Sequence, residues 1–294
     1  MKPKEILVII LLVTIAMLSF NCKLIMPQTE VETITEAEVI VDIPDILTPL
    51  ASGTSILEID QVIIDYSHTY YGYIMVKHIE CASIDIKIVI SKPNGVQHIY
   101  TLCPESGFDA FPLTGGDGTY SIKVLKHVEG TQYMELLSSS FDVVLANEFD
   151  PFLHPNQMVR FSRDCAVVRK ATELTTTLDN ISDKISVIGN FIVSNVTYDD
   201  NLIDMRVSGY IPDVNNVLER GSGLCLDFSA LMVAMLRSQN IPAKLVIGTA
   251  GELYHAWVEA HNGEEWIILD LTISGNPLTQ RRIGEMDYTI EFIY

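Results

Sequence analysis

Positively charged residues are scarce in this sequence. Its 294 residues include 19 Lys and Arg against 38 Asp and Glu, which gives a formal net charge of −19 at pH 7. Nucleic-acid affinity comes mainly from Lys and Arg that neutralise phosphates, so this balance excludes a nucleic-acid partner. The same shortage argues against electrostatic docking on an anionic lipid surface.

Cysteines and clustered metal ligands are also scarce. The five cysteines lie at positions 22, 81, 103, 165 and 225, too few and too scattered for a disulfide-built scaffold. No CxxC or HxxxH pair predicts a zinc site, and no GxGxxG or P-loop predicts a bound cofactor, so we expect neither. Apolar residues are plentiful, at 48% of the total, and suffice for the cores of two domains.

The N-terminus has the pattern of an export signal. Lys2 and Lys4 precede an uncharged run, Ile6–Phe20, that covers only about 22 Å as a helix, less than the ~30 Å of a bilayer core. We therefore interpret residues 1–26 as a signal peptide or membrane anchor. Cys22 stands where a bacterial lipoprotein cysteine would stand, although the three residues before it are not the small ones of a lipobox. In either case the rest of the chain is expected to be exported, at the cell surface or anchored to the membrane.

Residues 27–52 are acidic and contain Pro44 and Pro49, which interrupt regular elements. We interpret them as an extended linker whose negative charges repel one another. A short edge strand within this segment is the alternative.

Residues 53–146 show a period of two. Isoleucines at positions 84, 86, 88 and 90 alternate with other residues, and the alternation returns from Tyr120 to Val124. Asn94-Gly95 and the glycine-rich loop 115–118 supply turns. This pattern predicts an all-β, Ig-like sandwich, to which we assign spacing, docking or substrate presentation because no catalytic side chains gather in it.

Helical spacing begins after a linker that contains Pro151 and Pro155, so residues 147–294 are predicted to form the second domain. One helix is expected from about Arg163 to Leu178, with Ser162 as its N-cap. Ser182 is expected to cap a second helix with isoleucines at positions 185, 188 and 192 on its apolar face.

Cys225 follows a glycine-containing turn and begins an amphipathic segment. Apolar residues at positions 228, 231, 232, 235 and 236 give that segment helical periodicity, and it is expected to end near Asn240, before Pro242. The free N–H groups and positive dipole end of a helix lower the pKa of a cysteine placed there. The same N–H groups can stabilise an oxyanion.

Two alternating segments, 255–260 and 265–270, flank Asn262-Gly263, which predicts a hairpin with a two-residue type I′ turn. That turn would place His255 directly opposite Asp270 on one face of the sheet. A carboxylate there can accept the imidazole N–H, fix the tautomer and stabilise imidazolium. A slip of one residue would put Asp270 on the other face.

Over about residues 205–272 the chain resembles the transglutaminase-like superfamily. The resemblance implies an α+β fold with a papain-like core, with Cys225 as nucleophile, His255 as base and Asp270 as the residue that orients the base. Two features depart from the family pattern. Leu271 replaces the usual Pro between Asp and Thr. No Trp precedes the nucleophile to stabilise an oxyanion, and Tyr210 is a candidate for that role. The motifs that carry the resemblance are Gly223-x-Cys225 with Asp227-Phe228, Met235-Leu236-Arg237, Ile241-Pro242-Ala243, Gly248, His255-Ala256-Trp257-Val258, Trp266 and Asp270-x-Thr272.

These observations favour an exported thiol enzyme that transfers acyl groups from protein or peptide amides through a thioester. Water as acceptor would give hydrolysis, and an amine would give cross-linking; the residues leave both open. The alternative is a non-catalytic cell-surface module for adhesion or assembly. We also expect the other cysteines, Cys165 among them, to be much less reactive than Cys225.

Overall fold

The computed structural model describes residues 42–79, 85–93, 95–102, 107–203, 209–272 and 287–294. Val41–Tyr294 is one compact unit. The predicted signal or anchor (1–26) and the first part of the predicted linker lie outside the described residues. Among the helices that the structure describes, none is long and apolar enough to cross a membrane.

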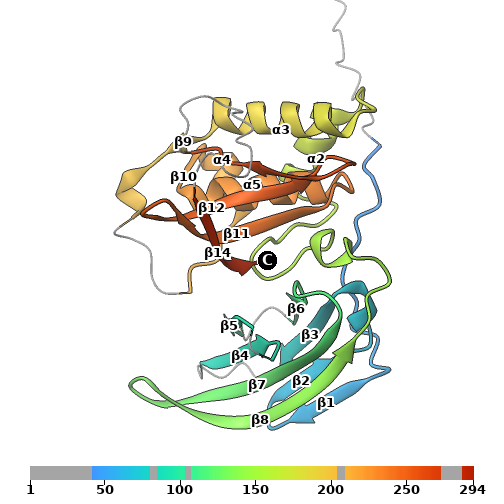
Figure 1. Ribbon diagram of the computed structural model, residues 1–294, viewed down its shortest axis with the longest axis vertical. Coiled ribbons are helices and arrows are strands. Elements are labelled where there is room, and N and C mark those ends of the chain that lie inside the picture. The colour runs from blue at the N-terminus through green and yellow to red at the C-terminus, as the bar shows by residue number, and fades with distance from the viewer. Residues whose placement is uncertain (1–41, 80–84, 94, 103–106, 204–208, 273–286) are drawn as a thin grey trace, which may run out of the picture. The chain divides into compact units, whose positions relative to one another are not determined.

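The β-rich region contains two four-stranded antiparallel sheets (Figure 1). Alternate residues of their strands, such as Ile74 and Ile122, are fully buried, which is the period-two pattern of the sequence. The fold class is therefore confirmed as α+β with an all-β region before the helical core. The strand order of the first sheet is β1 (Ile56–Ile59), β2 (Val62–Asp65), β3 (Tyr73–His78), β6 (Phe108–Pro112). The strand order of the second sheet is β5 (Gln97–Thr101), β4 (Ile86–Ser91), β7 (Gly118–Glu129), β8 (Gln132–Val143).

Residues 42–52, the described part of the predicted linker, contain no strand. They are nevertheless held on the folded body by hydrogen bonds. The backbone N–H of Leu50 donates to the Tyr73 hydroxyl at 3.1 Å, and the carbonyl of Leu47 lies 2.7 Å from Nδ1 of His154. This end of the segment is therefore fixed rather than freely extended.

The helical region follows η2 (Asp150–Phe152) and consists of α2 (Ala166–Thr175), α3 (Ile181–Asn195), α4 (Val214–Arg220) and α5 (Cys225–Arg237). Both predicted N-caps are wrong. Cys165 precedes α2, and Ser162 instead hydrogen-bonds its sulfur. The cap of α3 is Asn180, whose Oδ1 accepts from the N–H of Asp183 at 3.2 Å. The predicted apolar face of α3, with isoleucines at 185, 188 and 192, is buried.

Helix α5 is the centre of this region. Every residue from Leu226 to Arg237 is buried, because α5 packs against the other helices on one side and a sheet on the other. The chain leaves α5 through Asn240, whose φ of 57° is left-handed, as expected of a residue that ends a helix before Pro242.

The sheet that α5 covers is antiparallel, with the order β13 (Trp266–Leu269), β12 (Leu253–His261), β11 (Ala243–Ala250), β14 (Tyr288–Ile293). Leu245, Val258 and Leu269 lie on the face that shares the main core with α5. Trp257 lies on the opposite face, in a separate small cluster. Two short parallel strands, β9 (Thr197–Tyr198) and β10 (Ser222–Gly223), and two short 3-10 helices, η1 (Thr69–Tyr71) and η3 (Asp200–Leu202), complete the described elements.

The predicted two-residue turn between β12 and β13 is wrong. His261 pairs with Trp266, so the loop has four residues, 262–265. Asn262 closes this loop itself, since its Oδ1 accepts from the N–H groups of Glu264 and Glu265, both at 2.9 Å. The pairing is therefore shifted by two residues from the prediction. A shift of two keeps each side chain on its predicted face, because the period of a strand is two.

The β-rich region packs on β14. The hydroxyl of Thr114 donates to the carbonyl of Ile293 at 3.1 Å, and the ring of His98 lies 5.8 Å from that of Phe292. Apolar residues of both regions belong to one continuous core. The predicted boundaries 53–146 and 147–294 stay predictions.

Gly248 of β11 is required by the close approach of β14. A Cβ on this residue would overlap the carbonyl oxygen of Thr289. We expect Gly248→Ala to push β14 off β11 and to lower the free energy of unfolding by about 1–3 kcal/mol, the usual cost of overpacking. Thermal unfolding measures this loss. The control is Gly95→Ala, at a loop glycine without a left-handed φ, where the added Cβ meets no atom closer than 3.4 Å. Equal melting temperatures for the two variants would contradict the prediction.

Candidate active site

Cys225 is the first residue of α5 and is half-buried. The residue that fixes this helix start is Asp227, which is only 1% exposed. Its Oδ2 accepts from the backbone N–H of Leu224 at 2.8 Å, and its Oδ1 accepts from the hydroxyl of Tyr210 at 2.6 Å. Asp227 thus has a structural role at the helix start. Tyr210, the candidate for oxyanion stabilisation, uses its hydroxyl hydrogen on Asp227.

His255 and Asp270 are in contact. Nε2 of His255 lies 3.0 Å from Oδ2 of Asp270, and both side chains are buried, at 7% and 5% exposure. The four-residue loop places the pair diagonally rather than directly opposite, since Asp270 follows the pair Val258–Leu269. The predicted contact is therefore present, although the turn that was expected to produce it is not.

Cys225 also interacts with the imidazole. Burial lowers the pKa of His255, but hydrogen bonds to Asp270 and Cys225, with the charges of both groups, raise it to about 9. His255 is therefore expected to be imidazolium at neutral pH. Because Nε2 faces Asp270, Nδ1 is the ring nitrogen left for the thiol. A cysteine, a histidine and a carboxylate in this order can form a thiolate–imidazolium pair and pass a proton to a leaving group.

Two further residues hold Asp270, and sequence reasoning assigned neither of them a role. The hydroxyl of Tyr288 donates to Oδ2 at 3.0 Å, the oxygen that also faces His255. The backbone N–H of Thr272 donates to Oδ1 at 3.1 Å. Thr272 belongs to the recognised Asp-x-Thr motif, whereas Tyr288 stands on β14, and no local signal placed that strand next to the site.

The two tryptophans pack against other aromatic or cationic side chains. Trp257 is fully buried, and its ring packs 4.9 Å from that of Tyr288. Trp266 lies under the ammonium group of Lys244, 3.9 Å from its ring centre. Lys244 also pairs with Glu259 at 2.8 Å, and Glu259 is buried.

The pKa of Cys165 is shifted by its surroundings, while its expected low reactivity stays a prediction. Burial raises the pKa of this thiol, but hydrogen bonds from Ser162 and Asn215 and the charge of Arg169 outweigh burial and lower it. Its sulfur lies 3.2 Å from Nδ2 of Asn215. The structure therefore gives no reason to expect Cys165 to be inert.

In the part of the chain that the structure describes, no group of three or more His, Cys, Asp or Glu is placed to hold a metal ion.

Comparison with known proteins gives one family. Residues 168–271, which include Cys225, His255 and Asp270, match the family model of the transglutaminase-like superfamily. A relative, the uncharacterized protein YebA of Bacillus subtilis (strain 168), is 32% identical over 124 residues. That match covers 35% of this chain but only 17% of YebA, so the chain spans less than a fifth of this relative.

Two solved structures show a distant likeness. One is a candidate cysteine protease from Cytophaga hutchinsonii, with 21% identity and a TM-score of 0.37 over 68% of this chain and 79% of that one. The other is named as a TGase, with 18% identity and a TM-score of 0.33 over 55% of this chain and 47% of that one. The similarity to the transglutaminase-like superfamily rests on the match of residues 168–271 to its core-domain model.

Proposed function

We propose that this protein is a thiol enzyme that transfers acyl groups from protein or peptide amides through a thioester on Cys225. The observation that carries the proposal is the position of His255, which contacts the carboxylate of Asp270 at 3.0 Å and hydrogen-bonds the thiol of Cys225. A cysteine that served only to fill the core would not need a buried imidazole with its own carboxylate.

The reaction follows from these contacts. His255 holds the proton of the Cys225 thiol, and the thiolate attacks the carbonyl carbon of the amide. The C–N bond then breaks, the imidazolium gives its proton to the leaving nitrogen, and a thioester remains on the sulfur. The N–H groups at the start of α5 can stabilise the oxyanion. Water as acceptor completes hydrolysis, and an amine completes cross-linking.

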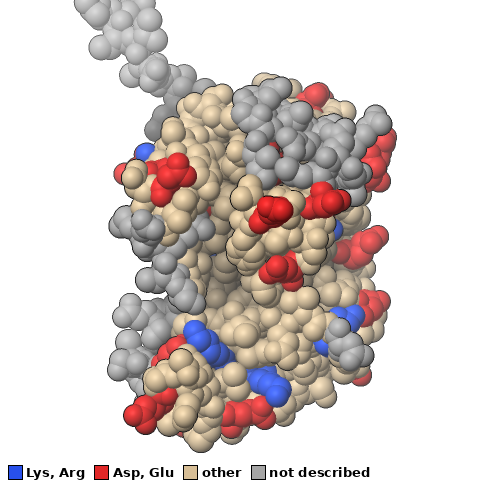
Figure 2. All heavy atoms as spheres, turned by 60° about the vertical axis from the view of Figure 1, so that its left-hand side comes forward, with Lys and Arg blue, Asp and Glu red and all other residues tan. Residues whose placement is uncertain are grey.

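Export and membrane tethering are part of the same proposal. The positive N-terminus and the apolar run of residues 6–20 support an exported protein held at the membrane by residues 1–26, with Cys22 as the candidate lipid attachment point. The acidic surface supports substrates that are neutral or basic. Figure 2 shows Asp and Glu spread over one face, with fewer Lys and Arg.

The test uses the full-length chain and its Cys225→Ala variant. Each is incubated with unstructured peptides and a small primary amine, and mass spectrometry reads both hydrolysis and amine incorporation. We expect turnover only with Cys225 present. Cys165→Ala is the matched control, because Cys165 is a second free cysteine with a lowered pKa and lies outside the site. Turnover that survives Cys225→Ala would remove Cys225 as the nucleophile, and no turnover with either protein would favour the adhesion or assembly module.

Tyr288→Phe should lower kcat about tenfold with little change in KM, because a hydrogen bond to a charged group contributes about 1.5–3 kcal/mol. The ring stays against Trp257, so only the hydroxyl that donates to Asp270 is lost. Tyr133→Phe is the control, since its hydroxyl donates to Asp85 in the β-rich region. Identical steady-state kinetics for Tyr288→Phe and the wild type would show that Thr272 is enough to hold Asp270.

A further inference from the structure

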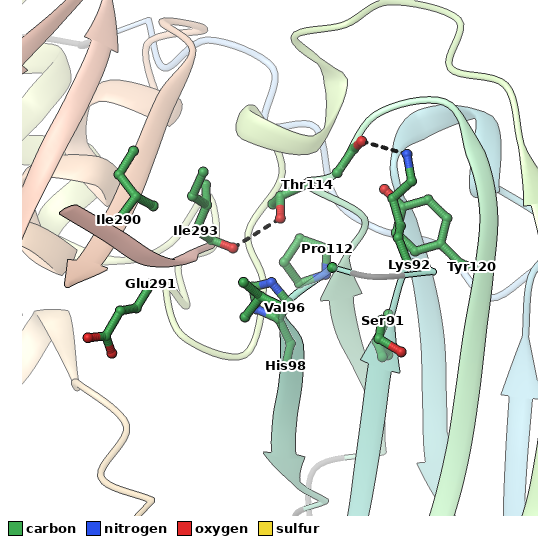
Figure 3. A pocket seen from close by; sticks show the side chains of 13 residues that line it. Ser91, Lys92, Val96, His98, Pro112, Thr114, Tyr120, Ile290, Glu291 and Ile293 are labelled. Carbon is green, nitrogen blue, oxygen red and sulfur yellow. Dashed lines mark hydrogen bonds between the residues drawn. The ribbon is translucent and has the colours of Figure 1, made fainter.

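A cavity of about 210 Å³ lies where the β-rich region meets β14. Figure 3 shows Val96, His98 and Pro112 on one side of it and Ile290 and Ile293 on the other. The hydrogen bond from Thr114 to the carbonyl of Ile293 joins the two sides at 3.1 Å. The cavity is thus made by both regions of the chain.

This cavity is close to the catalytic residues. On the sheet, Gly248 of β11 pairs with His255 on one side and with Ile290 on the other. Paired residues of antiparallel strands point to the same face, so His255 and Ile290 lie in one row, about 10 Å apart at ~4.8 Å per strand. Gly248 has no side chain to stand between them.

Tyr254 interacts electrostatically with one residue of the cavity lining and with the nucleophile. The pKa of the exposed Tyr254 is raised by burial of its hydroxyl and by the charges of Glu291 and Cys225. Glu291 also lines the cavity. Tyr254 is therefore within electrostatic reach of both the nucleophile and Glu291 of the cavity lining.

The lining selects an apolar group of moderate size. Ile290, Ile293, Val96 and Pro112 supply most of the wall, and a cavity of about 150 Å³ with such walls is large enough for benzene. The one cation, Lys92, already donates to the backbone carbonyls of Gly115 and Asp117. An apolar or aromatic side chain suits this lining better than a charged one.

We propose that this cavity binds an apolar side chain of an extended peptide substrate, about three residues from the amide that Cys225 attacks. An extended chain rises about 3.3 Å per residue, so three residues span the ~10 Å from His255 to Ile290. The inference rests on the proposed function and adds the feature by which a substrate is recognised. It also gives the β-rich region a role in substrate binding.

The experiment uses acetylated nine-residue peptides of Gly and Ser with a central Gln. Each peptide carries one Phe at a different distance from the centre, on either side, and none carries an acidic residue. Reaction at the Gln side chain or the neighbouring backbone amides is read by mass spectrometry. We expect kcat/KM to be at least tenfold higher for a Phe about three residues away, on one side, than for the Ser-only peptide.

Two variants connect this preference to the cavity. Val96 and Val128 are 49% and 60% exposed, and only Val96 lines the cavity. Val96→Glu should reduce kcat/KM for the best Phe peptide at least fivefold and leave the Ser-only peptide unchanged, whereas Val128→Glu should change neither. Thermal unfolding confirms that both variants are folded.

The outcomes separate the two proposals. Cys225-dependent turnover without a Phe preference, or with a preference that Val96→Glu does not alter, would overturn the cavity assignment and leave the proposed function standing. No Cys225-dependent turnover of any peptide, with Cys225 still alkylated by iodoacetamide in the folded protein, would overturn the proposed function and this inference with it.

Discussion

Asp270→Asn should lower kcat by about four powers of ten while the protein stays folded. The amide keeps the size of the carboxylate but presents an N–H₂ group as well as an oxygen, so it can hold the imidazole in the wrong tautomer. Replacing the carboxylate of a catalytic triad by an amide lowers kcat by a factor of this order. Steady-state kinetics on a turned-over peptide measures the loss, and thermal unfolding shows that the fold is kept.

The same variant should lower the pKa of His255. Asp270 contributes both a hydrogen bond and a charge to the imidazolium, which together with Cys225 raise that pKa to about 9. Without the charge, His255 loses its proton at lower pH, so the alkaline limb of the pH–rate profile should move to lower pH. A profile that does not move would mean that Asp270 does not stabilise the imidazolium.

Glu259→Gln is the matched control for Asp270→Asn. Glu259 is also a buried carboxylate on the face of the sheet that carries His255, but it pairs with Lys244 at 2.8 Å. Glu259→Gln should lower the free energy of unfolding and leave kcat within a factor of about three of the wild-type value. If both variants kept full activity, another carboxylate would have to orient His255.

The parts of the site that are local in sequence could be predicted. The glycine-containing turn and the apolar period place Cys225 at the first residue of α5, and the structure has it there. The contact of His255 with Asp270 could be predicted because it depends only on strand parity. The four-residue loop shifts the pairing by two, and that shift keeps the face.

The predictions that were wrong, those of the β12–β13 turn and the two helix N-caps, concern places where side chains compete for backbone groups. Asn262 bonds two N–H groups of its own loop, which sets a loop that the Asn-Gly pattern does not predict. Ser162 bonds the sulfur of Cys165 instead of capping α2, and Asn180 caps α3 in place of Ser182.

Tyr288 was missed for a different reason. Its contact with Asp270 requires β14 to pair with β11, and a pairing so distant in the sequence leaves no mark in either segment. The same holds for the cavity at β14, since its two sides come from regions far apart in the chain.

Arg237, at the end of α5, is a buried charged residue that joins three segments of the fold. It is 2% exposed and makes three hydrogen bonds to backbone carbonyls: Nε to Ala243 at 2.8 Å, Nη1 to His154 at 2.7 Å and Nη2 to Tyr294 at 2.8 Å. These carbonyls belong to β11, to the segment after the β-rich region and to the residue after β14. Burial lowers the pKa of the guanidinium to about 9, and the three acceptors offset the cost of burying its charge.

Arg237→Met should lower the free energy of unfolding by about 3–5 kcal/mol. The apolar replacement fills most of the space but removes a donor from three carbonyls. That of Tyr294 keeps the N–H of Leu245 at 3.0 Å, whereas each buried carbonyl left unsatisfied costs about 1–3 kcal/mol. Urea unfolding followed by circular dichroism measures the loss. Arg163→Met is the control, since Arg163 also donates to a carbonyl, that of Pro44, but its side chain is 52% exposed, and its loss should stay within about 0.5 kcal/mol. A loss equal to that of the control would mean that the hydrogen bonds of Arg237 are not needed to hold these segments together.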